Sequence, residues 1–264
     1  MLEQLQSYQT YFSPREQEAL DRAVGVANQF AYESANNHII RWDMDLGFEK
    51  FHPDVRDTNH DHILGCLHMA DTYQNIYKNL AKRINMFELK CMILLHDADE
   101  VPDRKDIPMC HPVRDTDEWS TMKRRNQMRV TLGMIPKYVE PEYQEYATSL
   151  YLRFIRQDPS DVTALFARYI DKSQGNRFGC EHVFPFSLEN PLEPTMERRT
   201  HVTKSIESIM KPATMLYPLL TVDEQDELTF LVMGDIGRFE HIGFANEARG
   251  SVEQWYGMMN RDES

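Results

Sequence analysis

Apolar residues recur every three or four positions along most of the chain, which is the spacing of helices that bury one face. The first such segment begins with Ser13 as N-cap, Pro14 at the first helical position and Glu16 three residues after the cap. No segment alternates strongly between apolar and polar residues, as a half-buried strand would. We therefore expect an all-α fold. The predicted helices cover residues 13–34, 62–84, 87–98, 118–134, 143–156, 160–174, 196–210, 221–237 and 251–259.

The same pattern indicates how the helices are organised. Residues 87–98 have a nearly all-apolar centre, so this helix should be buried in the core. Gly175 should end the predicted helix 160–174. The proline-rich segments 101–117 and 178–195 should be loops. We expect an all-α domain over residues 1–178 and a helical extension, 179–264, that packs on it and does not fold independently.

Composition and charge narrow the classes of partner. The 264 residues carry 42 acids against 29 bases, a net charge of -13 that repels a phosphate backbone, so no long nucleic acid is expected. No apolar run approaches ~18 residues, and the N-terminus lacks a basic start and an apolar core, so neither a membrane partner nor a secretory signal is expected. Four cysteines without a CxxC pair favour reduced thiols and a cytoplasmic protein.

Two His-Asp dipeptides occur, and their contexts differ. His60-Asp61 lies in a polar run before a helix, which Asp61 could simply cap. His96-Asp97 ends an apolar run, where an ionisable pair is costly unless a metal ion or a hydrogen-bonded core network compensates it. The two explanations are equally consistent with this feature alone. If the helix continues, Glu100 lies on the same side one turn later and could hold a water or move protons.

Asp171 raises the same question, because it lies at the edge of the apolar stripe of helix 160–174. Its partner could be Lys172, an arginine or a divalent cation. A second imidazole would come from the helix near residue 62, where His60, His62 and His68 are candidates. The residues four, seven and eleven positions after His62 are apolar, so His62 points inward and is favoured, with His68 as the runner-up. Two imidazoles and two carboxylates would suit a hard or borderline metal ion.

The order His62, His96-Asp97, Asp171 resembles the signature of the HD superfamily of metal-dependent phosphohydrolases, a helical-bundle family. Within it, the chain is most similar to the bacterial 5'-deoxynucleotidase family over roughly residues 15–178. The matching stretches are Arg41-Trp42, Asp61-His62, His96-Asp97-Ala98-Asp99-Glu100-Val101 and Asp106-Ile107-Pro108. The chain departs from that family at Ile63, where a small hydroxylated residue is usual, and residues 181–264 have no counterpart in it.

The resemblance implies a role for each matched residue. Arg41 would clamp a phosphate, and Trp42 would lie against the sugar and help to exclude a 2'-hydroxyl. Glu100 and Asp106 would handle the attacking water and the leaving 5'-oxygen, and Asp106 would also contact the substrate. One divalent ion (Co, Mn, Mg, Zn or Fe) would be held by His62, His96, Asp97 and Asp171.

The expected function is therefore metal-dependent hydrolysis of a small-molecule nucleotide, a deoxynucleoside 5'-monophosphate, to the deoxynucleoside and phosphate. Two alternatives stay open. One is hydrolysis of a deoxynucleoside di- or triphosphate with release of pyrophosphate or triphosphate, and the other is a non-catalytic nucleotide-binding module. The C-terminal helices would form either a homodimer contact or a lid over the site.

Overall fold

The computed structural model describes residues 14, 15, 18, 22, 25, 40, 41, 57–102, 112–184 and 196–259. Over these residues the fold is all-α, as predicted, apart from one antiparallel pair of two-residue strands, β1 (Ile40–Arg41) and β2 (Asp57–Thr58). The α-helices are α3 (Asn59–Ile76), α4 (Lys78–Arg83), α5 (Met86–Leu95), α6 (Asp117–Arg129), α7 (Ile135–Tyr138), α8 (Gln144–Arg156), α9 (Val162–Phe178), α11 (Met196–Leu216), α12 (Val222–His241) and α13 (Ala245–Met259). The 3-10 turns are η3 (Ala98–Glu100), η4 (Pro112–Asp115), η6 (Pro141–Tyr143) and η8 (Tyr217–Leu219), and the π-helical turns are η5 (Val130–Met134) and η7 (Gly179–Val183).

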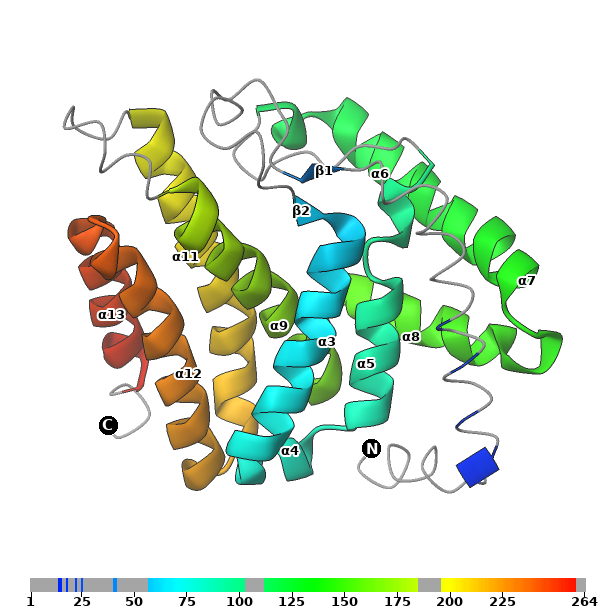
Figure 1. Ribbon diagram of the computed structural model, residues 1–264, viewed down its shortest axis with the longest axis horizontal. Coiled ribbons are helices and arrows are strands. Elements are labelled where there is room, and N and C mark those ends of the chain that lie inside the picture. Colours follow the sequence, from blue (N-terminus) through cyan, green and yellow to red (C-terminus); the bar gives the residue numbers. More distant parts are fainter. Residues whose placement is uncertain are drawn as a thin grey trace.

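Three helices form the centre of the molecule. α3, α5 and α9 pack against one another, with α6, α7 and α8 on one side and α11, α12 and α13 on the other (Figure 1). The apolar run of α5 is buried, as its composition predicts: Cys91, Met92 and Ile93 are fully buried. The N-terminus of α3 and the C-terminus of α5 lie at the same end of this layer, close to the β1–β2 pair (Figure 1).

Helix α3 begins with a capping box. The hydroxyl of Thr58 accepts a hydrogen bond from the backbone N–H of Asp61, and the Asp61 carboxylate accepts one from the backbone N–H of Thr58. Asp61 therefore helps to cap the helix, while Thr58 rather than Asp61 is the N-cap residue. This cap fixes the register at which the following residue, His62, enters the core.

The predicted helix 62–84 is wrong in its length, because the chain breaks at Tyr77 into α3 and α4. The carboxylate of Glu227, on α12, accepts hydrogen bonds from the backbone N–H groups of Asn79 and Leu80, at 3.2 and 2.7 Å. A carboxylate that caps the N–H groups of a first turn stabilises a helix start at that point. The break thus reflects a contact with a residue far away in the sequence.

The C-terminal helices pack closely on the rest of the described structure. Asp235 of α12 is almost completely buried and accepts hydrogen bonds from Tyr169, Ser173 and Arg177, all on α9. α9 continues directly into the π-helical turn η7, so the boundary predicted between residues 178 and 179 falls inside a continuous helical segment. None of the described helices combines the length and hydrophobicity needed to cross a membrane.

Other parts of the predicted pattern are only partly covered. Of the predicted helix 13–34, the described positions 14, 15, 18, 22 and 25 are helical. The proposed loop 178–195 is wrong at its start, since residues 179–183 are helical, and residues 185–195 lie outside the described part of the chain.

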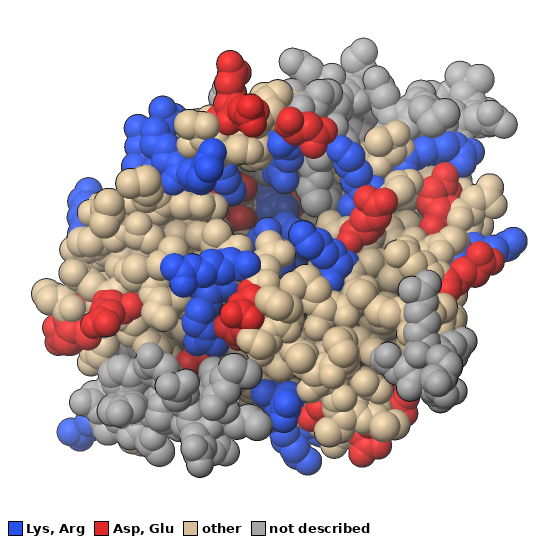
Figure 2. All heavy atoms as spheres, turned by 180° about the vertical axis from the view of Figure 1, so that it is seen from behind, with Lys and Arg blue, Asp and Glu red and all other residues tan. Residues whose placement is uncertain are grey.

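On the face opposite to that of Figure 1, lysine and arginine side chains gather around a hollow in spite of the net negative charge (Figure 2).

Candidate metal centre

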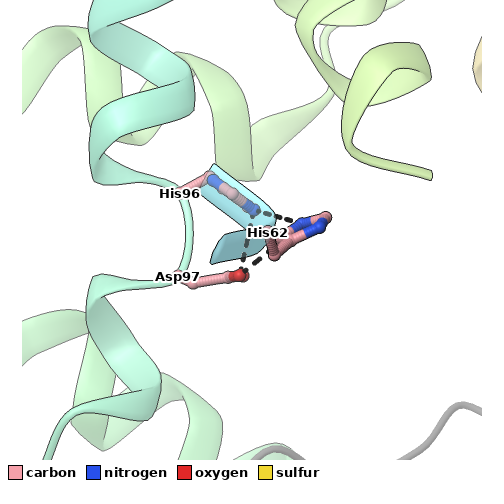
Figure 3. Close-up of side chains that lie close together, drawn as sticks. All are labelled: His62, His96 and Asp97. Atoms are coloured by element: carbon pink, nitrogen blue, oxygen red, sulfur yellow. Dashed lines mark hydrogen bonds and ion pairs between the residues drawn. The ribbon is translucent and has the colours of Figure 1, made fainter. Parts of the chain in front are cut away.

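Two histidines and an aspartate point toward one another where α3 meets the end of α5 (Figure 3). His96 Nε2 lies 3.3 Å from His62 Nε2 and 3.0 Å from Asp97 Oδ2, and His62 Nε2 lies 3.9 Å from the same carboxylate oxygen. One ligand atom from each of the three residues lies within 4.8 Å of the others, so together they could hold a metal ion.

Asp171 of α9 joins this group through the two imidazoles. Its Oδ1 lies 3.3 Å from His62 Nε2 and 3.6 Å from His96 Nε2. Its other oxygen, Oδ2, is paired with Lys172 at 2.9 Å and with Arg168 at 3.2 Å, so the lysine and an arginine both contact this carboxylate, on the oxygen that faces away from the imidazoles. The structure therefore brings all four predicted ligands together, and their binding of a metal stays a prediction.

Hydrogen bonds to carbonyl groups orient both imidazole rings. His96 Nδ1 donates to the backbone carbonyl of Ile93 at 2.6 Å, and His62 Nδ1 donates to the side-chain oxygen of Gln174. A carbonyl oxygen can only accept, so each Nδ1 carries the proton and each neutral ring turns the lone pair of Nε2 toward the cluster. Metal-binding histidines are typically oriented in this way.

The atoms that these four residues direct at one another are therefore all acceptors when the histidines are neutral. Acceptors at this spacing repel one another unless a cation lies among them. Protons meet part of this need: burial lowers the pKa of His96, but the charges of Asp97 and Asp171 outweigh burial and raise it from 6.5 to about 10. Two imidazoles and two carboxylates are equally a donor set for a divalent cation, so the residues fit a metal ion.

Arg41 lies beside this cluster, and its role in phosphate binding stays a prediction. Its Nη1 is 3.5 Å from Asp97 Oδ2, and its Nε is 3.3 Å from Asp57 Oδ2 on the neighbouring strand. Only 14% of its side chain is exposed. A guanidinium held next to a metal site is well suited to bind a phosphate that also contacts the metal.

Gly175 makes room for this guanidinium. A Cβ at this position would lie 3.2 Å from Arg41 Nη2 and 3.8 Å from the Cε1 atom of His62. Gly175 was predicted to end a helix, but it lies inside α9, one turn after Asp171. The absence of a side chain at position 175 therefore lets Arg41 lie close to α9. The prediction of a helix end is wrong because this glycine provides space for Arg41 and does not terminate the helix.

Glu100 reaches the site in a different way from the one predicted. α5 ends at Leu95, so Glu100 does not share a helix with His96 and Asp97 but lies in the turn η3. Its backbone N–H donates to the carbonyl of Asp97 at 3.0 Å, and its Oε2 accepts a hydrogen bond of 2.7 Å from the side chain of Asn59. Asn59 lies one turn before His62 on α3, so Glu100 is held near the histidine side of the cluster.

An ion pair between a partly exposed lysine of α6 and a buried aspartate secures the same turn. Lys123 Nζ lies 2.8 Å from Asp99 Oδ2, and Asp99 is almost completely buried. Burial raises the pKa of the Asp99 carboxyl group, and the charge of Lys123 opposes this increase. Lys123 therefore ties α6 to the turn that carries Glu100.

The remaining predicted residues separate into two groups. Trp42 and Asp106 lie outside the described residues. His68 is exposed and points away from the cluster, and His60 is partly exposed and close to its own neighbour Asp61, so His62 is the histidine of α3 that faces the site. Asn59 and Gln174 were not singled out by the sequence, and only their three-residue spacings from His62 and Asp171 could have suggested them.

Comparisons with known proteins give little further support. No protein-family model and no curated protein matches the chain. A crystal structure of a predicted metal-dependent phosphohydrolase from Magnetospirillum magnetotacticum MS-1 is similar, with 17% sequence identity and a TM-score of 0.47 over 81% of this chain and 97% of that chain. A likeness of this degree does not establish a shared function.

Proposed function

We propose that the protein is a metal-dependent phosphohydrolase that converts deoxynucleoside 5'-monophosphates to deoxynucleoside and phosphate. The observation that carries the proposal is the meeting of four acceptor side chains beside a largely buried guanidinium. Such a cluster is costly to bury without a cation, and a cation next to Arg41 makes a site for a small anion. The resemblance of the Arg41-Trp42 and His96-Asp97 stretches to 5'-deoxynucleotidases supports the choice of substrate.

Each residue of the site has a role in this reaction. His62, His96, Asp97 and Asp171 would hold one divalent ion, which would lower the pKa of a coordinated water from ~15.7 toward ~7 and offset the charge of the phosphate. Arg41 would bind the non-bridging phosphate oxygens and stabilise the charge that develops on them.

The carboxylates would manage the protons. Glu100, which Asn59 holds in place, would accept a proton from the attacking water. Asp106 would protonate the leaving 5'-oxygen, and Trp42 would exclude ribonucleotides by contact with C2' of the sugar; both roles come from the family resemblance alone.

A second candidate is hydrolysis of a deoxynucleoside di- or triphosphate. Arg168 and Lys172 add two positive charges on the outer oxygen of Asp171, within 3.2 and 2.9 Å. Positive charge beyond that of Arg41 would favour a substrate with a longer phosphate chain. The products distinguish the candidates, because only the monophosphate reaction releases inorganic phosphate as its sole phosphorus product.

The test is a product assay with the full chain. The protein is stripped of metal, reloaded separately with Mn²⁺, Co²⁺, Mg²⁺ or Zn²⁺, and incubated with ribo- and deoxynucleoside mono-, di- and triphosphates. Phosphate, pyrophosphate and triphosphate are then separated by ion chromatography. We expect phosphate from the deoxynucleoside monophosphates, at a rate well above that from the ribonucleotides.

Matched variants show whether the cluster is responsible. His96→Ala and Asp97→Ala should abolish turnover, whereas His68→Ala, which changes an exposed histidine of α3, should leave it unchanged. Release of pyrophosphate or triphosphate would establish the second candidate in place of the first. Nucleotide binding without turnover under every metal would leave only the binding module.

A further inference from the structure

Gln174 connects the candidate metal centre to the packing of α3 against α9. It lies one turn after Asp171 on α9, and its side-chain oxygen is the acceptor for His62 Nδ1. The other ring nitrogen of His62, Nε2, is 3.3 Å from both Asp171 Oδ1 and His96 Nε2. One amide thus determines which nitrogen of His62 faces the cluster.

Few other groups could perform this task. Cys66 Sγ lies 3.9 Å from His62 Nδ1, but a thiol is a weak acceptor and is fully buried here. The matching nitrogen of His96 uses a backbone carbonyl, that of Ile93, which a side-chain substitution cannot remove. Of the two histidines, His62 is therefore the one whose ring orientation depends on a replaceable side chain.

Gly65 provides the space that this amide occupies. It lies one turn after His62 on α3, and a Cβ built on it would lie 2.5 Å from Gln174 Nε2 and 2.9 Å from Gln174 Cδ. Real Cβ contacts are essentially never this short, and the atoms concerned are the far end of a flexible side chain. An alanine at position 65 would therefore displace the Gln174 amide and leave His62 itself intact.

We propose that Gln174 is a positioning residue for the metal centre: its side-chain amide holds the His62 ring so that Nε2 faces Asp171 and His96. Position 65 is then glycine because the Gln174 amide occupies the space that a side chain would need. The inference deepens the proposed function, since it rests on the same four ligands. It predicts a loss of metal affinity from two substitutions that remove no ligand. Removal of an outer hydrogen-bond partner of a ligand typically weakens metal binding about 10- to 100-fold.

The test measures metal binding directly, by the electron paramagnetic resonance signal of free Mn²⁺ titrated with the metal-free full chain. Gln174→Ala should raise the dissociation constant about 10- to 100-fold. Gln174→Glu keeps an acceptor at the same place and should bind Mn²⁺ at least as tightly as the wild type. Gln74→Ala, an exposed position on α3, is the matched control and should change nothing.

A double-mutant cycle separates positioning from general damage to the fold. Gly65→Ala should weaken Mn²⁺ binding in the wild-type background and have no further effect in Gln174→Ala, because it acts only through the displaced amide. Additive losses, equal losses in Gln174→Ala and Gln174→Glu, or unchanged affinity in Gln174→Ala would each overturn the proposal. A wild-type chain that binds no Mn²⁺ would overturn it together with the proposed function, whereas tight binding without phosphate release would overturn the function alone.

Discussion

Replacement of Gly175 by alanine should lower activity without lowering stability. Gly175 lies in the interior of α9, so an alanine there gains about 1 kcal/mol of helix propensity. Against this gain, the new Cβ would lie 3.2 Å from Arg41 Nη2, and the guanidinium would have to retreat by a few tenths of an ångström. Because a long side chain can yield at little cost, we expect the free energy of unfolding to stay the same or to rise by up to about 1 kcal/mol.

Catalysis should not tolerate the same displacement. A hydrogen bond to a charged group contributes about 1.5–3 kcal/mol. Partial loss of one such bond between Arg41 and the phosphate, about 1.4 kcal/mol, corresponds to a decrease of kcat/KM of about tenfold. Mn²⁺ binding should be unchanged, because none of the four ligands contacts the new methyl group more closely than the 3.8 Å to His62.

Three measurements check this prediction: kcat/KM for phosphate release, the thermal unfolding midpoint, and Mn²⁺ affinity. Gly237→Ala is the matched control, because this glycine is also helical and a Cβ there meets nothing within 4 Å. It should raise the unfolding midpoint and leave kcat/KM unchanged. Arg41→Ala gives the activity that remains without the guanidinium.

A Gly175→Ala protein that retains kcat/KM within twofold of the wild type, while Arg41→Ala loses activity, would refute this prediction. The close approach of Arg41 to α9 would then have no role in catalysis. If Arg41→Ala is itself fully active, Arg41 does not bind the phosphate, and the proposed mechanism is wrong at that point.

Three further predictions concern acid stability, the C-terminal helices and metal binding. Burial lowers the pKa of His201 to about 4, so this histidine binds a proton more readily in the unfolded chain than in the folded protein. The free energy of unfolding should therefore fall by about 2 kcal/mol between pH 7 and pH 5. In urea titrations, His201→Gln should remove this loss, whereas His68→Gln, at an exposed position, should not. Asp235→Ala should lower the free energy of unfolding by about 3 kcal/mol, because it leaves the hydrogen-bond donors of α9 without their buried acceptor. Asp226→Ala, at an exposed position of the same helix, should change it by less than about 0.5 kcal/mol in the same titration. Mn²⁺ affinity should rise about tenfold per pH unit between pH 6 and pH 8, because His96, with a pKa of about 10, is protonated in this range and the ion must displace that proton. An Mn²⁺ affinity that does not change with pH would contradict a protonated cluster.

Residues within one helix carried most of what could be predicted about the site. The apolar neighbours of His62 on one side of its helix were enough to choose it over His68, because burial follows helical periodicity. The position of His96-Asp97 at the end of a buried helix and that of Asp171 at the edge of an apolar stripe marked ionisable groups that need partners. These signals are local, and the structure brings the three segments together.

Contacts between distant segments account for two of the errors. Glycine is a common helix terminator, so Gly175 indicated a helix end, but the guanidinium of Arg41 lies where a side chain would be and the helix continues. The break at Tyr77 carries no glycine or proline signal, and it coincides with the contact of Glu227 with the start of α4. In both cases the deciding partner lies more than a hundred residues away.

The helical class and the burial of α5 could be predicted from the sequence alone, because both depend on residues close together in the chain; the same local patterns marked His62, His96, Asp97 and Asp171 as candidates, and the family resemblance joined them into one ligand set. The contacts of Asn59 with Glu100, of Gln174 with His62 and of Arg41 with Gly175 became visible in the three-dimensional structure. The physical reason is that orientation comes from hydrogen bonds and steric room between helices, and neither leaves a periodic trace in the sequence.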